Sequence, residues 1–179
     1  MIMAIDPGSK LSAYVIFNDE EVILEKGKIK NEEIFQKIDT LNPIYVFGAV
    51  VIEKIASYGM AVGEEVFETV TWTGRFMQHA INKSIEVERV PRREVKIHFC
   101  HSMKAKDGNI RQALIDRFGP PGVKKMPGKL YGVRADEWQA LALAVYYMDM
   151  DKLKGNIYNQ VNQEKGYGKK ETIDNQGAP

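Results

Sequence analysis

Two acidic side chains end runs of residues that are typical of buried strands. Asp6 follows the apolar run MIMAI at the start of the chain, and Glu53 follows the run VFGAVVI. A charge at the end of a buried strand is costly unless another group compensates it. Asp136, in the first turn of a later apolar helix, is a third candidate acid. The chemistry of the chain depends on whether these acids converge.

Converging carboxylates favour hard cations such as Mg²⁺ or Mn²⁺. Two such ions ~3.5–4 Å apart can activate a water and stabilise the leaving oxygen of a phosphodiester. Each acid alone also has a simpler interpretation. Asp6 suits a turn before Pro-Gly, Glu53 can pair with Lys54 or Lys10, and Asp136 is favoured by a helix dipole. Only the convergence of all three argues for metal binding.

The order of predicted elements gives a sheet that can bring the first two acids together. Short turns join the first three strands, which predicts an antiparallel meander, and helices then alternate with strands. We predict strands at Ile2–Asp6, Leu11–Asn18, Val22–Lys28, 46–53 and 85–90, and helices at 32–41, 62–81, 91–100, 109–118 and 134–150. This order predicts an α/β fold with a mixed five-stranded sheet and helices on both faces. The strands that end in Asp6 and Glu53 can be neighbours at its centre.

Length and composition favour one domain. Residues 1–152 carry the predicted elements, and residues 153–179 are polar enough for a flexible tail. The single cysteine, Cys100, excludes an internal disulfide and suits a cytoplasmic location. The longest apolar run, Ile44–Ile52, is far shorter than the ~20 residues of a membrane-spanning helix, so we expect no membrane partner.

Positive charge is concentrated in one block of the chain. The net charge is −5 over residues 1–82, +8 over residues 83–134 and −2 over residues 135–179. The basic block predicts a face that binds a polyanion such as nucleic acid; the alternative is a solvated surface neutralised by the acidic first third. The candidate phosphate-binding residues are Lys104, Lys106, Arg111, Lys124, Lys125 and Lys129. Arg92, Arg93 and Lys96 fit either interpretation equally.

Three short motifs together resemble a known family. They are IDPG at residues 5–8, VVIE at residues 50–53, and a helix of the form D-x-x-x-ALALA from Asp136. In this order and spacing the chain resembles the RuvC-type Holliday junction resolvases of the RNase H-like superfamily, over residues 1–150. The segments KAKD and KKMPGKLYG are similar to the bacteriophage branch.

The resemblance implies an RNase H-like fold and a Mg²⁺-dependent endonuclease, with Mn²⁺ able to substitute. Its substrates would be four-way junctions and other branched DNA, cut by hydrolysis of phosphodiester bonds. The family acts as a homodimer, and the helix Val62–Ile81 is the candidate interface. The resemblance also implies that the protein acts in the cytoplasm, which is the cytoplasm of the host if a phage encodes the chain.

The resemblance also assigns roles to individual residues. Asp6, Glu53 and Asp136 match the metal-binding and catalytic acids of the family. The family usually has another aspartate three residues after the last of these, where this chain has Gln139. An amide offers a metal one carbonyl oxygen but no negative charge, and it cannot act as a base. The alternative function is therefore a branched-DNA-binding protein without catalysis.

Other features are less specific. Tyr58 and Met60 follow Glu53 in a Gly-containing segment and suit a wedge between bases at a junction, although a core or loop role fits them equally. His98, Cys100 and His101 lack the paired spacing of a structural zinc site. An actin-like nucleotide-binding domain would need a second similar subdomain, for which 179 residues leave no room.

Overall fold

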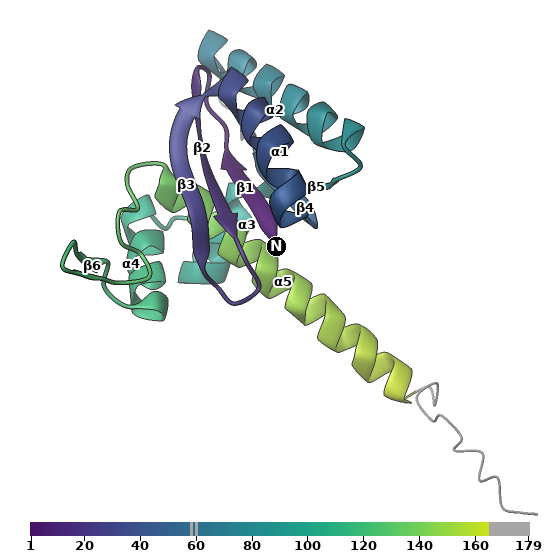
Figure 1. The fold of residues 1–179 in the computed structure, drawn as a ribbon, viewed down its shortest axis with the longest axis vertical. Helices are drawn as coiled ribbons and strands as arrows, with labels where there is room; N and C mark the ends of the chain where they lie inside the picture. The colour runs from purple at the N-terminus through teal and green to yellow at the C-terminus, as the bar shows by residue number, and fades with distance from the viewer. Residues whose placement is uncertain (58, 60, 165–179) are drawn as a thin grey trace, which may run out of the picture. The chain divides into compact units, whose positions relative to one another are not determined.

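Five strands form one mixed sheet with β1 at its centre. The computed structural model describes residues 1–57, 59 and 61–164. The strands are β1 (Ile2–Asp6), β2 (Leu11–Phe17), β3 (Ile23–Lys30), β4 (Ala49–Lys54) and β5 (Glu86–Pro91), in the spatial order β3-β2-β1-β4-β5 (Figure 1). The first three strands are antiparallel, whereas β4 runs parallel to both β1 and β5. The predicted mixed five-stranded sheet with an antiparallel start is confirmed.

Helices cover both faces of this sheet, as predicted (Figure 1). They are α1 (Asn31–Tyr45), α2 (Glu64–Asn82), α3 (Arg92–Cys100), α4 (Asp107–Phe118) and α5 (Glu137–Glu164). Residues 1–147 form one compact unit, and residues 148–179 are a second unit. None of the helices in the described part of the chain is long and apolar enough to cross a membrane.

The alternation of side chains along β1 separates two cores. Met3 and Ile5 point toward α1 and α2, where they join a buried cluster that includes Ile34 and Phe76. Ala4 and Asp6 therefore point to the opposite face, because successive residues of a strand alternate between faces. The carboxylate of Asp6 thus lies on the side of the sheet that α1 and α2 leave free.

The opposite face is covered by α4 and by the first part of α5. Phe17 of β2 and Phe118 of α4 have ring centroids 6.3 Å apart in an edge-to-face arrangement. Leu141 of α5 lines the same small hollow as these two rings. Residues 140–145 of α5 are all buried, which explains why this stretch is apolar on every side.

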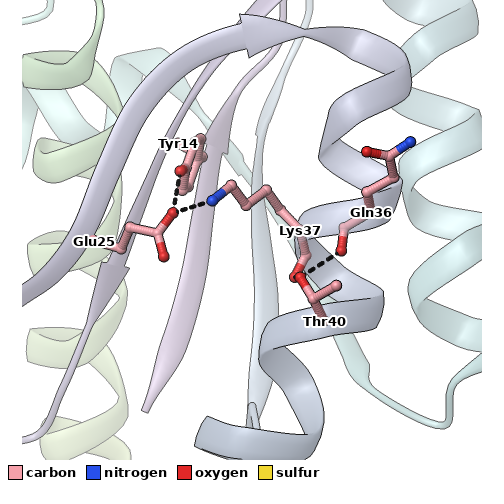
Figure 2. A network of polar contacts seen from close by, with 5 residues as sticks. All are labelled: Tyr14, Glu25, Gln36, Lys37 and Thr40. Carbon is pink, nitrogen blue, oxygen red and sulfur yellow. Dashed lines mark hydrogen bonds and ion pairs between the residues drawn. The ribbon is translucent and has the colours of Figure 1, made fainter.

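A polar network fixes α1 against the sheet (Figure 2). The Tyr14 hydroxyl of β2 donates to Glu25 Oε1 of β3 at 2.5 Å, and Lys37 of α1 donates to the same oxygen. Burial and the hydrogen bond to Glu25 raise the pKa of Tyr14, so its phenol stays protonated. Tyr14 is paired with Ile5 in the sheet and shares its face. The network is therefore on the face opposite Asp6 and has a structural role.

Two segments differ from the sequence-based prediction. Residues 119–132 were expected to lack regular structure, but they contain a short hairpin of β6 (Gly122–Val123) and β7 (Met126–Pro127). Residue 122 has a φ of 74°, which glycine adopts without strain.

The second difference is at the end of the chain. Helix α5 continues to Glu164, so residues 153–164 of the expected tail are helical, and the flexibility of this segment stays a prediction. A helix that is already formed extends without a new nucleation cost, which explains how polar residues continue it. The rest of the predicted tail, residues 165–179, lies outside the described residues.

Candidate active site

Asp6 and Glu53 lie at the same edge of the sheet. Ile5 and Ile52 are paired in the parallel ladder between β1 and β4, and the two acids are the next residue on each strand. Parallel strands direct equivalent residues to the same face, so both carboxylates point toward the α4 and α5 side. Glu53 is buried, with 9% of its surface exposed. The prediction that these two strands are neighbours at the centre is confirmed.

The turn after Asp6 is held by a buried hydrogen-bonded chain. The Gly8 backbone N–H donates to Ser12 Oγ at 3.2 Å, and this hydroxyl donates to Asn31 Oδ1 at 2.7 Å. Asn31 Nδ2 in turn donates to the Gly8 carbonyl oxygen at 2.9 Å. A side chain at residue 8 would place its Cβ 2.3 Å from the Leu11 carbonyl oxygen, so this turn requires glycine. Asp6 is therefore presented by a rigid turn.

Burial makes both carboxylates harder to ionise. Burial raises the pKa of Asp6 to about 7, and the neighbouring Glu53 carboxylate adds to this increase. Arg92 acts in the opposite direction on Asp6, while Asp136 and Asp107 raise its pKa further. Burial also raises the pKa of Glu53, against the effect of Arg92. A cation bound between these acids would remove the cost of ionising Asp6.

Arg92 and Asp107 belong to the site, although the sequence analysis did not place them there. Arg92 Nη1 donates to Glu53 Oε2 at 2.7 Å, and Nη2 donates to Asp107 Oδ1 at 2.6 Å. The structure therefore pairs Glu53 with Arg92, and not with Lys54 or Lys10, the partners considered from sequence. The order of elements contained a signal for Arg92, because this residue directly follows β5, the strand that pairs with β4.

Asp136 is near the pair but is engaged elsewhere. It lies immediately before the first residue of α5, so the prediction that it occupies the first helical turn is corrected by one position. Its carbonyl oxygen accepts from the Gln139 and Ala140 backbone N–H groups. Its carboxylate accepts from Lys28 Nζ of β3 at 2.5 Å. Asp136 contributes to the charge around Asp6 while pairing with a lysine.

The donor set fits a hard divalent cation in part. Among residues 1–57, 59 and 61–164, no three His, Cys, Asp or Glu side chains are grouped closely enough to hold a metal ion. Asp6 and Glu53 offer the oxygen ligands that Mg²⁺ prefers, and Glu53 is already paired with Arg92. Asp136 is paired with Lys28 through Oδ2, so a cation would compete with this lysine for its carboxylate. Gln139 is half-buried three residues further along α5, where its amide replaces a possible carboxylate.

The basic candidates lie on exposed surfaces of the same unit. Lys104 and Lys106 precede α4, and Arg111 lies on α4 with its guanidinium 4.8 Å from the centre of the Trp138 ring. Lys124 and Lys125 form the turn of the β6–β7 hairpin, and Lys129 follows it. In Figure 1 this hairpin lies beyond α4, away from the sheet.

A second basic surface lies next to Glu53. An open hollow of about 350 Å³ is lined by Arg92, Arg93, Lys96 and Met103. Arg92 is already bonded to two acids, so of the three undecided cations it is the one least available to a phosphate. The hollow lies beside the acid pair and is large enough for part of a DNA backbone.

The structure leaves one further prediction untested. The proposed wedge residues Tyr58 and Met60 lie outside the described residues. The two tryptophans, Trp72 and Trp138, are buried.

Comparison with known proteins supports the fold. No family model matches the sequence, and no curated protein matches it. The Thermus thermophilus RuvC structure matches with a TM-score of 0.61 and 16% identity, over 84% of this chain and 96% of that chain. T. thermophilus RuvC in complex with Holliday junction substrate matches with a TM-score of 0.60 and 16% identity, over 81% and 90%.

The crystal structure of the yeast mitochondrial Holliday junction resolvase also matches. Its TM-score is 0.63 at 12% identity, over 90% of this chain and 83% of that chain. At such identities a match establishes the arrangement of elements and leaves the activity to be argued from the site. The chain therefore has the RNase H-like fold of the RuvC-type Holliday junction resolvases.

Proposed function

We propose that this chain is a metal-dependent endonuclease that cuts branched DNA, with four-way junctions as its main substrate. The observation that carries the proposal is the Asp6–Glu53 pair at the ends of adjacent central strands. It supplies two carboxylates on rigid elements, Glu53 buried and Asp6 half-buried, next to a basic surface. Solved proteins of the same fold include one in complex with a Holliday junction substrate.

Each residue has a defined task in this proposal. Asp6 and Glu53 would hold Mg²⁺ or Mn²⁺, with Asp136 as a third ligand and the Gln139 amide oxygen as a fourth. The bound ions supply an activated water and charge stabilisation for hydrolysis of the phosphodiester. The Ser12–Asn31 chain keeps the turn after Asp6 in position, so the carboxylate is presented by a rigid element.

The basic residues would bind the DNA backbone. Lys104, Lys106 and Arg111 are grouped around the start of α4, and Lys124, Lys125 and Lys129 extend along the hairpin and the segment after it. Contacts of this kind position DNA without reading its sequence, and they weaken steeply with salt. Recognition of a branch would then depend on where the two groups contact separate arms.

A homodimer would suit a junction with two-fold symmetry. One side of α2 buries Trp72, Phe76 and Ala80 in the core. The other side, here called the α2 outer face, carries Phe67, Val70, Gly74 and Ile81, all exposed and spaced by three, four and seven residues. The space around Gly74 is open, so a second helix can approach closely there. We propose this face as the contact with a second copy.

The biological role we propose is the resolution or debranching of recombination intermediates, in phage DNA as the KAKD and KKMPGKLYG segments imply. A second candidate function is binding of branched DNA without cutting. The observations that favour it are Gln139 in place of an acid and the engagement of Asp136 by Lys28.

A labelled synthetic four-way junction distinguishes the two functions. The protein is incubated with Mg²⁺, Mn²⁺ or EDTA, beside a linear duplex of the same sequence, and with Asp6→Asn as a control. We expect symmetric nicks in either metal that are absent with EDTA and in Asp6→Asn. Tight junction binding without nicks would reject the nuclease and favour the binder. Cleavage gained by Gln139→Asp would then identify the missing acid.

A further inference from the structure

Arg92 connects three elements around the acid pair. It is the first residue of α3, and its guanidinium donates to Glu53 at the end of β4 and to Asp107 at the start of α4. The side chains of Arg92 and Glu53 are 24% and 12% exposed, whereas that of Asp107 is 58% exposed. The buried part of this bridge is therefore the bond to Glu53.

The bond to Glu53 uses the carboxylate that a divalent cation would need. A carboxylate has two oxygens, so space alone does not prevent it from holding both partners. However, a guanidinium and a divalent ion a few ångströms apart repel each other, and repulsion is strong in a poorly solvated site. Guanidinium binding and cation binding at Glu53 therefore oppose one another.

We propose that Arg92 is a positioning residue that serves as an internal counter-cation, holding Glu53 and the start of α4 together until a divalent cation takes its place at Glu53. The inference rests on the proposed function, since it requires that a cation binds at Glu53. It adds a regulatory consequence. Helix α4 begins at Asp107, directly after Lys106, so loading of the cation would loosen the first turn of α4 beside this lysine, while the buried Ile110 and Leu114 hold the rest of the helix.

The affinity for Mn²⁺ in the absence of DNA tests this inference. Isothermal titration of the parent, Arg92→Gln and Arg92→Lys would be compared with Arg93→Gln. Arg93 is exposed, lies next to Arg92 and lines the same hollow, so its variant removes the same charge without the bond to Glu53. A charge-assisted hydrogen bond contributes enough to change a binding constant about tenfold or more.

We expect Arg92→Gln to bind Mn²⁺ at least about tenfold more tightly than the parent. Arg93→Gln should stay within about threefold of the parent, because only long-range attraction changes there. Arg92→Lys should lie between, since an ammonium keeps the charge but lacks the planar fork with which the guanidinium bonds both acids. Unchanged or weaker Mn²⁺ binding by Arg92→Gln would overturn the proposal and would mean that Arg92 prepares Glu53 for the cation.

A measurement on the unmodified chain covers the case in which Arg92→Gln does not fold. Hydrogen exchange of the peptide that contains Asp107 should accelerate when Mn²⁺ is added to the parent. Unchanged exchange of this peptide at saturating Mn²⁺ would contradict the proposal that Arg92 releases Glu53.

The failure of this inference is distinguishable from failure of the proposed function. If the parent and Asp6→Asn bind Mn²⁺ with equal affinity, Asp6 does not form a metal site, and both proposals fail. A parent that binds Mn²⁺ through Asp6 and cuts junctions, but whose affinity does not rise in Arg92→Gln, leaves the function standing and rejects the role of Arg92.

Discussion

Neutralising Asp6 should make the metal-free protein more stable at alkaline pH. The pKa of this carboxyl is about 7 in the folded chain, because of burial and the adjacent Glu53. The ordinary pKa of an aspartate is 3.8. Between these two values the folded state keeps a proton that the unfolded state has released. Stability therefore falls as pH rises through this interval, and the contribution of Asp6 is lost above pH 7.

The size of the effect follows from the pKa. Each pH unit over which only the folded state is protonated changes the free energy of unfolding by about 1.36 kcal/mol. Two such units separate pH 5 from the folded pKa, so the parent should lose about 3 kcal/mol relative to Asp6→Asn between pH 5 and pH 8. Asparagine has nearly the same shape and does not titrate, so other groups cancel in the comparison.

Urea denaturation in EDTA measures this difference. Unfolding free energies of the parent and Asp6→Asn would be determined at pH 5 and pH 8, with Asp116→Asn as a control on the exposed surface of α4. We expect the advantage of Asp6→Asn to grow by about 3 kcal/mol at the higher pH, and that of the control to stay constant. A difference between Asp6→Asn and the parent that is independent of pH would refute the reasoning about the acid pair.

Three further predictions concern DNA binding and stability. Replacing Lys124 and Lys125 by alanine should reduce the slope of log K against log salt for junction binding by about 2, measured by fluorescence anisotropy; an unchanged slope would place the hairpin away from DNA. Leu141→Ala should lower the unfolding free energy by about 2–5 kcal/mol in urea, because this side chain is fully buried; a loss below about 1 kcal/mol would contradict its core position. Asn31→Ala should cost about 1–3 kcal/mol and slow junction cleavage, since Ser12 and the Gly8 carbonyl lose their partner. Normal kinetics in that variant would show that the turn after Asp6 holds without it.

The sheet could be predicted from sequence because its signals are local. Five apolar or alternating runs, separated by turn residues, gave five strands, and the two acids at strand ends identified the edge where the site lies. From sequence the two strands could be neighbours, and the parallel register of β1 and β4 in the structure places Asp6 beside Glu53. What local pattern determines, such as strand type and the face of each residue, was therefore accessible.

The rest of the site depends on contacts between distant segments. The bonds from Arg92 to Glu53 and Asp107, and from Lys28 to Asp136, join residues that are far apart in the sequence, and for Arg92 the order of elements was the only signal we identified. Which acid a surface lysine or arginine pairs with is determined only in the complete fold, because several acids compete for it. For the same reason the β6–β7 hairpin was missed, since its two-residue strands are too short to show alternation.

The central position of β1 also has a consequence for the order of folding. β1 pairs with β2 immediately, but its other edge stays open until β4 is synthesised. An unpaired apolar edge in a nascent chain invites pairing with other chains. A partly synthesised chain therefore carries an aggregation-prone edge before β4 brings Glu53 beside Asp6.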